Sequence, residues 1–567
     1  MDGYVDEPTC LGVPPYLSTY PRYIAGAIWQ HSPKTNIIYQ TIDAVRESFA
    51  DAIELWSNSD MLILVAGMVV PGKYIGGTPI SVRETKELFS HQVLAGIPKL
   101  LAGPWAKYGC GIEGGRVAVS PAELSPPFDY LVKGDTGLVI ATLARSGWRF
   151  SDTDFTMKDA IANTGELILR GAQVVKQAPG FERGHIICEI ETYRGCPRYL
   201  TGGCSFCTEP LYGEPNQRPA EQIVREIEAL YAQGVRAFRI GKQADLFVYG
   251  SPEMGEEEFP TPNPSAVAVL FSKIREVAPE IETLHIDNVN PGTLARHPTE
   301  SRLVAKEIMK YHTVGDVAAF GVESLDPVVI RKNNLKATPD QVLDAIRLLN
   351  EVGSKREGRS LPHLLPGINL VYGLPGESAQ TLEHNLEFLL DILEENLLVR
   401  RINIRQMIGF EDTRASDATK GRVKRNQFFR HKKQVRNLVD IKILEKVAPR
   451  GTVIESVYLD KYQGKSLLYR PLGTYPLLCH MSNGIKPLDR IDVMVVDHGP
   501  RSVSVVPHPF QINNASLSQL ESIPGMGSKR AARIKINSPL SNIIELENVM
   551  EFEIPDWLRE SIDFSGS

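Results

Sequence analysis

One short segment, residues 191–210 (ETYRGCPRYLTGGCSFCTEP), constrains this chain more than any other. It carries three cysteines, Cys196, Cys204 and Cys207, among glycines and prolines. Three thiolates this close in sequence can hold an iron–sulfur cluster and leave one iron without a protein ligand, so that the open iron can bind a small molecule. Two other interpretations stay open: a structural zinc site, which would need a fourth Cys or His, and a disulfide framework, which is rare in a large protein of ordinary composition.

Length and composition indicate a globular protein of several domains. A chain of 567 residues is too long for one hydrophobic core and predicts about three or four domains. Its net charge of −6 argues against a protein dominated by nucleic-acid electrostatics. The longest apolar run, residues 61–70, is too short to cross a bilayer, and the start, MDGYVDEPTC, has no signal sequence, so we expect a cytoplasmic protein with no membrane partner. The remaining cysteines are scattered, as is typical of reduced thiols: Cys10, Cys110, Cys188 and Cys479.

Residues 1–175 alternate between helical and strand patterns. The run MLILVAGMVV predicts a buried parallel strand, with the amphipathic segment AVRESFADAIELW before it and the Gly-rich segment PGKYIGGTP after it. ETKELFSHQVLAG, IPKLLAGPWA and FDYLVKGDTGLVIATLAR continue the alternation. The pattern predicts a doubly wound, Rossmann-like α/β domain with ligands at the carboxyl ends of its strands, where glycines would let a bulky planar ligand approach the backbone.

Residues 184–415 predict a second α/β domain. HIICEIETYRG, VRAFRIG, ETLHIDNVNP, VAAFGVESLD, LPGINLVYGLPGES and RRINIRQMIG read as successive strands, separated by helices such as TPDQVLDAIRLLNEVG.

The composition shifts after this domain. Residues 416–450 form a basic helical connector, in which residues 420–436 hold eight Lys or Arg and no acid; such a run is most often a solvated face, and otherwise grips an acidic partner or nucleic acid. Residues 451–512 are β-rich and resemble a small barrel of the TRAM type. Residues 513–567 resemble a helix-hairpin-helix domain, with its hairpin at residues 523–527. Lys529, Arg530 and Arg533 follow this hairpin, as in motifs that hold phosphate, but a structural or docking role is an equal alternative.

The cysteine segment resembles the signature of the radical S-adenosylmethionine (SAM) enzymes, whose cluster loop follows the first strand of a partial (β/α) barrel. This resemblance implies a [4Fe–4S] cluster on Cys196, Cys204 and Cys207 and SAM on the open iron. Seven residues separate the first two cysteines, where the family usually has three. FGVES resembles the strand whose Glu contacts SAM, which points to Glu323 and Ser324. The YGLPGES turn points to Gly373 and Gly376, and the end of VRAFRIGKQAD to Lys242 and Gln243.

Residues 14–145 resemble the cobalamin-binding domain that precedes the barrel in B12-dependent radical SAM enzymes. No Asp-x-His-x-x-Gly motif is present, so the resemblance implies base-off cobalamin with no histidine ligand on the cobalt. A degenerate domain that no longer binds cobalamin is the alternative. The residues that this likeness assigns to cobalamin are Gly67, Met68, Val69, Val70, Gly76, Gly103, Pro104, Trp105, Gly134 and Asp135.

Together these features resemble a group of cobalamin-dependent radical SAM methyltransferases with a C-terminal helix-hairpin-helix. Within the group, the sequence most resembles the enzyme that methylates an unactivated carbon of a glutamine in methyl-coenzyme M reductase of methanogens. The resemblance implies a protein substrate, namely the reductase alpha subunit, and a monomeric enzyme. An RNA-modifying enzyme that holds RNA with its TRAM-like and helix-hairpin-helix parts is the alternative. A nucleic-acid-binding protein with a relict barrel is disfavoured by the intact cysteine triplet.

Overall fold

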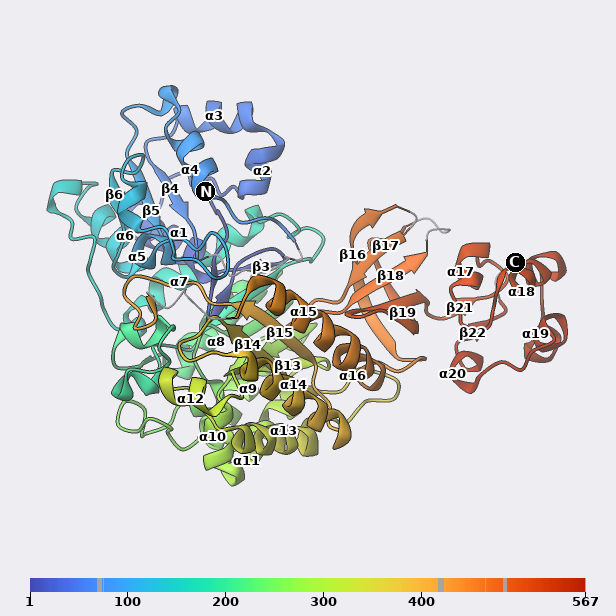
Figure 1. Ribbon diagram of the computed structural model, residues 1–567. Coiled ribbons are helices and arrows are strands. Elements are labelled where there is room, and N and C mark those ends of the chain that lie inside the picture. The colour runs from blue at the N-terminus through green and yellow to red at the C-terminus, as the bar shows by residue number, and fades with distance from the viewer. Residues whose placement is uncertain (69–73, 75, 417–422, 465, 483–486, 566–567) are drawn as a thin grey trace.

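The computed structural model describes residues 1–68, 74, 76–416, 423–464, 466–482 and 487–565. Four parts follow one another along the chain: an α/β N-terminal domain, a larger α/β barrel, a small β-barrel and a helical C-terminal domain (Figure 1). The expected mixed α/β fold class is confirmed. None of the helices within these ranges is long and apolar enough to cross a membrane.

The N-terminal domain has a parallel sheet between two helical layers. Its strand order is β4 (Leu62–Val65), β5 (Lys99–Ala102), β6 (Tyr130–Leu131). All four residues of β5 are buried, because alternate side chains enter two different cores, one with α1 and α6 and the other with α3 and α4. The helices are α1 (Thr19–His31), α2 (Ile42–Glu47), α3 (Phe49–Ser57), α4 (Val82–Phe89), α5 (Pro104–Tyr108), α6 (Thr136–Arg145) and α7 (Gly165–Gly171).

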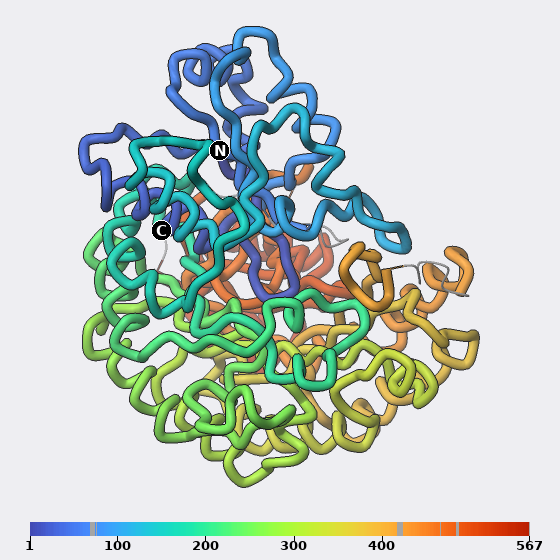
Figure 2. The backbone as a smooth tube through the Cα atoms, turned by 90° about the vertical axis from the view of Figure 1, so that its left-hand side faces the viewer, coloured from blue at the N-terminus to red at the C-terminus, as the bar shows by residue number. Residues whose placement is uncertain are grey.

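The first residues of the chain connect this domain to the barrel. β1 (Asp6–Glu7) and β2 (Cys10–Leu11) pair in a hairpin, and β3 (Tyr16–Leu17) joins the barrel sheet in parallel with β7 (Ile187–Glu191). Figure 2 shows this blue segment descending from the N-terminal domain into the barrel. The barrel sheet therefore pairs a strand from the start of the chain with a strand that follows the whole N-terminal domain.

The barrel consists of two four-stranded parallel sheets that are continuous around Asp287. One sheet has the order β11-β10-β7-β3 and the other β12-β13-β14-β15, and Asp287 lies between β11 and β12. The edges of the combined curved sheet are β3 and β15. Its remaining strands are β10 (Ala237–Gly241), β11 (Thr283–Ile286), β12 (Asn288–Val289), β13 (Asp316–Glu323), β14 (Leu364–Tyr372) and β15 (Arg401–Gln406).

Helices cover the outside of this sheet, as the green-to-yellow ring in Figure 2 shows. α13 (Pro339–Gly353) illustrates why they form: Thr338 and Gln341 make a capping box, and Val342, Ala345, Ile346 and Leu349 place a buried stripe on one face. The others are α8 (Ala220–Ala232), α9 (Pro264–Val277), α10 (Pro291–Arg296), α11 (Pro298–Tyr311), α12 (Pro327–Asn333), α14 (Ala379–Glu394), α15 (Arg425–Val435) and α16 (Ile441–Val447).

The β-rich region is a closed barrel of order β16-β17-β18-β20-β19. A loop between β17 and β18, residues 471–477, hereafter the bridging loop, reaches both edges of the large sheet. The Tyr16 hydroxyl of β3 donates to Gly473 O, and Arg400, just before β15, donates to Tyr475 O at 2.7 Å. The bridging loop thus spans the gap between β3 and β15. The strands are β16 (Val453–Gln463), β17 (Ser466–Arg470), β18 (Leu478–Ser482), β19 (Arg490–His498) and β20 (Ser502–Pro507).

The C-terminal domain lies beyond the small barrel, at the end farthest from the N-terminal domain (Figure 1). The expected hairpin at residues 523–527 connects α17 (Leu517–Glu521) to α18 (Ser528–Asn537), and Gly525 has a φ of +85° in this turn. α19 (Ile543–Met550), α20 (Asp556–Arg559), β21 (Phe510–Gln511) and β22 (Ile562–Asp563) complete the domain.

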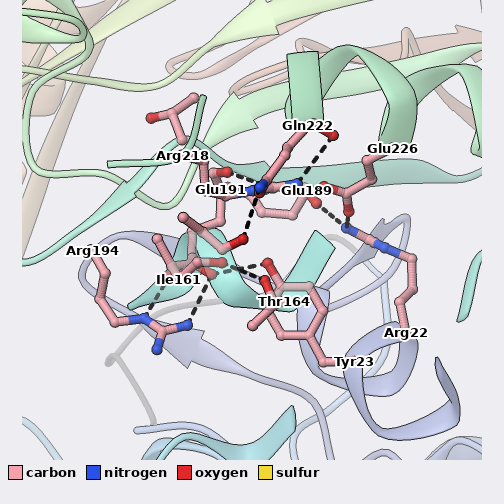
Figure 3. A network of polar contacts seen from close by, with 12 residues as sticks. Arg22, Tyr23, Ile161, Thr164, Glu189, Glu191, Arg194, Arg218, Gln222 and Glu226 are labelled. Carbon is pink, nitrogen blue, oxygen red and sulfur yellow. Dashed lines mark hydrogen bonds and ion pairs between the residues drawn. The ribbon is translucent and has the colours of Figure 1, made fainter. Parts of the chain in front are cut away.

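A buried polar network joins the N-terminal domain to the barrel (Figure 3). Glu226 of α8 accepts from Arg22 of α1 at 3.0 Å and from Arg218 at 2.7 Å, and all three side chains are at most 1% exposed. Tyr23 of α1 donates to Glu191 at 3.0 Å, at the end of β7. Because α1 belongs to one domain and β7 and α8 to the other, this network fixes their relative position.

Candidate active site

The cysteines lie in the loop that follows β7. Between Cys196 and Cys204, residues Pro197–Thr201 form a short 3-10 helix, and Gly202 and Gly203 have φ angles of +78° and +61°. Glycine adopts this left-handed conformation at little cost, so the chain can reverse within a few residues. The seven-residue spacing therefore folds as a compact turn, and Cys204 returns to the same cavity as Cys196.

One cavity of about 120 Å³, the cluster cavity, is lined by Cys196, Cys204 and Cys207. Among the described residues, no three His, Cys, Asp or Glu side chains converge closely enough to hold a single metal ion. A cluster needs its thiolates arranged around a volume, and the three thiols are placed in this way. The residues present therefore fit a [4Fe–4S] cluster. The wall that faces the thiols includes Asp245, Asn288, Asn290, Glu323 and Lys336.

Burial controls the state of the thiols. It raises the pKa of Cys196 to about 12 and the pKa of Cys207 well above its ordinary value. A metal cluster must therefore displace protons when it binds. Arg198 donates to Cys204 Sγ at 3.2 Å and is held by Glu258 at 2.9 Å, so one cationic donor is already directed at a cluster ligand.

Glu323 ends β13 in a strained conformation that turns it into the cluster cavity. Its φ is +67°, a left-handed value that non-glycine residues rarely adopt, and a bulge interrupts the register between Gly321 and Glu323. Lys336 Nζ lies 3.5 Å from Glu323 Oε1 and donates to Gly321 O at 3.2 Å. Strain of this kind persists where the surroundings enforce it and is concentrated at functional sites.

Burial works against the ionised form of Glu323, so its carboxylate gains from cationic neighbours. Burial raises the pKa of Glu323, and Lys336 only partly offsets it. Burial alone would lower the pKa of Lys336, but Glu323 and the three thiols outweigh it, so that pKa is raised. A cationic ligand group, such as the amino group of SAM, would therefore be stabilised beside Glu323.

Two other residues assigned to SAM from the sequence are buried close to this cavity but do not line it. Gln243 accepts from Thr192 Oγ1 at 3.1 Å, and Ser324 Oγ accepts from Asp326 N at 3.2 Å. Both side chains thus form hydrogen bonds within the protein, Gln243 to a neighbouring loop and Ser324 to the local backbone.

The remaining three SAM candidates also lie outside the cluster cavity. Lys242 is ion-paired with Glu7 of the N-terminal hairpin. Gly373 and Gly376 both have φ angles of +91° in the turn after β14, where Gly373 N donates to Glu377 at 2.8 Å. Of the six predicted residues, the structure brings Glu323 together with the cysteines.

A larger cavity of about 520 Å³, the barrel cavity, adjoins the cluster cavity. The two share Pro8, Phe206, Asn288, Glu323 and Asn369 as lining residues. Met68 and Tyr74 of the N-terminal domain form part of the barrel-cavity wall, and Thr474, Tyr475 and Pro476 of the bridging loop form another part. Its volume lies in the range of about 300–1,000 Å³ that is usual for ligand and cofactor sites.

The residues assigned to cobalamin do not form one surface. Met68 lines the barrel cavity, whereas Gly103, Pro104, Gly134 and Asp135 line a separate cavity of about 180 Å³. Trp105 is fully buried in the core of the N-terminal domain. Val69 and Val70 lie outside the described residues. Of the two cavities that these residues line, the barrel cavity is the larger, and a further cavity of about 620 Å³ in the N-terminal domain is lined by none of them.

The glycines assigned to cobalamin lie against the chain's own backbone. A Cβ on Gly67 would lie 2.4 Å from Asp6 N, one on Gly76 2.2 Å from Pro14 O, and one on Gly134 2.1 Å from Met157 O. A Cβ on Gly103 would lie 2.7 Å from Ala66 O. These glycines allow close approach of the chain's own backbone, which at Gly67 and Gly76 is the N-terminal segment, and Gly103 and Gly134 also line the cavity of about 180 Å³.

Three residues of the cluster cavity were not predicted from the sequence: Asp245, Lys336 and Arg198. Asp245 caps the turn after β10 by accepting from Phe247 N at 3.1 Å, and burial raises its pKa to about 6. An Asp at the carboxyl end of a parallel strand is a recognisable signal. Lys336 follows a helix in an ordinary loop sequence, so no local pattern identifies it.

Comparisons with known proteins agree with this arrangement. Residues 190–389 match the model of the radical SAM superfamily. The chain is 43% identical over 511 residues to the uncharacterized protein MJ0274 of Methanocaldococcus jannaschii, covering 89% of this chain and 92% of that protein. It is 40% identical over 553 residues to an uncharacterized protein of Archaeoglobus fulgidus, covering 97% and 96%. The solved structure of the methyltransferase TsrM from Kitasatospora setae, with cobalamin and a [4Fe–4S] cluster bound, aligns at 14% identity and a TM-score of 0.43 over 70% of this chain and 71% of that one, a likeness too remote to carry a functional argument.

Proposed function

This chain belongs to the family that includes MJ0274 and carries a radical SAM domain, and we propose that it is a cobalamin-dependent radical SAM methyltransferase acting on a protein. The specific proposal is C-methylation of a glutamine in the alpha subunit of methyl-coenzyme M reductase. The radical SAM domain implies a [4Fe–4S] cluster and SAM.

One observation carries the proposal: the cluster cavity shares five lining residues with a second cavity of about 520 Å³, a volume that is usual for ligand and cofactor sites. A [4Fe–4S] cluster with SAM supplies a carbon radical that can remove hydrogen from an unactivated carbon. Methylcobalamin supplies a methyl group that such a carbon can accept, which polar methyl transfer from SAM does not provide. Met68 and Tyr74 would border cobalamin from the N-terminal domain.

The chain's own residues bind and shield the reactants. Glu323, buried beside Lys336, would accept a hydrogen bond from the SAM amino group, and Asp245 is placed to accept one from a hydroxyl or amino group across the cavity. Phe206 and Pro8 line both cavities, so their apolar surface would exclude water from the passage between them.

The C-terminal basic residues support a protein target over RNA. Arg530 donates to Gly525 O and to Met550 O, at 2.5 Å and 3.2 Å, and Arg533 pairs with Glu551 at 2.9 Å. In the basic connector, Lys432 and Arg436 donate to backbone carbonyls of β15. Because these four groups already serve internal contacts, they are less available to bind phosphates.

The test is anaerobic co-expression with the reductase alpha subunit, followed by mass spectrometry of its peptides. We expect one methyl group on a glutamine, which is lost in Cys204→Ala and retained in Cys479→Ala, a buried cysteine of the small barrel. Methylation of RNA and not of protein would overturn the target assignment.

A second measurement tests the cofactor. Purified protein should take up about one cobalamin per chain in base-off form, as seen by absorption, independently of the target supplied. Failure to bind cobalamin would refute the methyltransferase proposal while leaving the cluster and SAM intact.

A further inference from the structure

One side of the barrel cavity is strongly cationic. Along β15, Arg401, Asn403 and Arg405 line the cavity, whereas Ile402 and Ile404 are buried hydrophobic residues of the barrel core, and of these two only Ile404 also borders the cavity. Successive strand residues point to opposite faces, so the period of two in RINIR directs both arginines to the inside. The interior of a barrel of this kind is normally filled by branched apolar side chains, and these two arginines need an explanation.

Three further cations border the same space: Lys432, Arg436 and Arg501. Arg436 is ion-paired with Asp440 and also donates to Ile402 O, and Lys432 donates to Ile404 O. These two residues are thus held against β15 by the backbone. Their charges add to the positive potential of the cavity, and Asp440 cancels one of them.

Arg401, Arg405 and Arg501 have no ion-pair or hydrogen-bond partner among the described residues. Arg401 stacks over Tyr475 at 4.6 Å, but its Nε is buried without an acceptor. Burial, with Arg501 and Arg405 nearby, lowers the pKa of Arg401 to about 9. Arg401 and Arg405 are partly buried, whereas Arg501 is exposed, so the cost of an unpaired cation falls on the first two. An anionic group of a bound molecule would offset that cost.

The carboxylates that line the cavity do not fill this role. Glu7 is paired with Lys242, Asp287 with Arg239, and Glu323 with Lys336. Asp6 hydrogen-bonds Tyr74. Arg405 is near enough to Asp287 and Glu323 to counteract the rise that burial causes in the pKa of each, but neither acid lies within ion-pair distance of it. Each of these acids has its closer partner on the side of the N-terminal hairpin and the cluster.

We propose that Arg401, Arg405 and Arg501 form an oxyanion subsite that binds a carboxylate or phosphate of the molecule occupying the barrel cavity. This inference rests on the proposed function, which supplies two sources: an acidic side chain of the protein target next to the methylated residue, and the phosphate of cobalamin. Arg501 is exposed to solvent, so the subsite reaches the protein surface, where a macromolecular target would enter. Planar guanidinium groups suit both oxyanions because they can donate two parallel hydrogen bonds.

The first experiment uses inorganic phosphate as the probe, on the full chain with its cluster. Phosphate should raise the melting temperature of the wild-type protein above that in chloride of equal ionic strength, and the double variant Arg401→Gln/Arg501→Gln should lose this increase. Arg83→Gln/Arg225→Gln is the matched control, because these arginines are exposed on α4 and α8 and neither lines the barrel cavity. This result does not depend on methyl transfer, so it separates the subsite from the proposed function.

Two further arms identify the source of the oxyanion. Two peptides would contain the target glutamine and differ only at the neighbouring position, which is Glu in one and Gln in the other. The wild type should bind the Glu peptide about tenfold or more tightly, and the double variant should bind both equally. If instead the variant loses a preference for cobalamin over cobinamide, which lacks the phosphate, the source is the cofactor. Both results support the subsite.

Stability provides a check against a purely structural role. Without phosphate, Arg401→Gln should melt no lower than the wild type, because it removes a buried unpaired charge. A lower melting temperature, together with unchanged binding of phosphate, acidic peptide and cobalamin in the double variant, would overturn the proposal.

Discussion

Glu226→Gln should lower the stability of the protein by weakening the junction between the N-terminal domain and the barrel. Glu226 is the carboxylate shared by Arg22 and Arg218, and none of the three side chains is more than 1% exposed (Figure 3). The substitution keeps the shape and one hydrogen-bonding oxygen but removes the negative charge. Two guanidinium groups then stay buried with backbone carbonyls as partners, among them Glu189 O and Glu191 O.

The expected loss follows from this burial. Removing one partner of a buried ion pair costs about 3–5 kcal/mol, since the remaining charge has no compensation, and here two cations share that partner. The retained carbonyl contacts and the amide oxygen reduce the cost, so we expect about 3 kcal/mol. For a unit the size of this barrel, 1 kcal/mol corresponds to roughly 2–4 °C, which predicts a fall in melting temperature of roughly 6–12 °C.

Differential scanning calorimetry of the cluster-loaded protein would measure this change. The control is Glu228→Gln, two residues away on the exposed side of α8, which should change stability by at most about 0.5 kcal/mol. If Glu226→Gln melted within about 2 °C of the control, a value corresponding to about 1 kcal/mol or less, the network would not hold the domains together and the reasoning would fail.

Three further predictions concern the site and its surroundings. Cys204→Ala should abolish the absorption of the [4Fe–4S] cluster in a folded protein, whereas Cys479→Ala should keep it. Glu323→Gln should weaken SAM binding about 10- to 100-fold, as measured by equilibrium dialysis, because a charge-assisted hydrogen bond is lost; unchanged affinity would remove Glu323 from the SAM site. Burial raises the pKa of Glu189 to about 8, so the folded state binds its proton more tightly than the unfolded state, and its contribution to stability falls as pH rises from about 4.5 to 8. In thermal melts, the melting temperature of Glu189→Gln relative to that of the wild type should rise as the pH increases across this window. A difference in melting temperature that stays constant with pH would refute the assignment.

Much of the fold could be predicted from the sequence because local pattern and tertiary position agree. The run IPKLLAGPWA gives a strand buried on both faces, as the pattern indicates, but a short helix begins at Pro104 where an exit loop is expected. The series of strands after the cysteine segment is also observed. What the pattern does not contain is long-range pairing: nothing in PPYLS indicates that Tyr16 and Leu17 join the barrel sheet.

The site was predictable where chemistry is concentrated in one segment. The three cysteines and Glu323 line one cavity, because each follows a barrel strand at the same end of the sheet. A glycine in the sequence indicates close approach but does not say of what, and at Gly67 and Gly76 the chain's own N-terminal segment approaches. The roles of Lys336 and of the arginines of β15 depend on neighbours that are distant in sequence, so no local sequence pattern identifies them.

The pairing of β3 with β7 determines which fragments of this protein can fold on their own. A fragment that begins at the barrel's own first strand would leave β7 with a row of free backbone groups, and an open strand edge is a template for association between copies. Expressed alone, residues 184–450 should therefore aggregate or recruit a foreign strand, and adding the first eighteen residues as a separate peptide should restore solubility. The N-terminal segment is therefore part of the barrel and not an accessory to it, because β3 completes one edge of the barrel sheet.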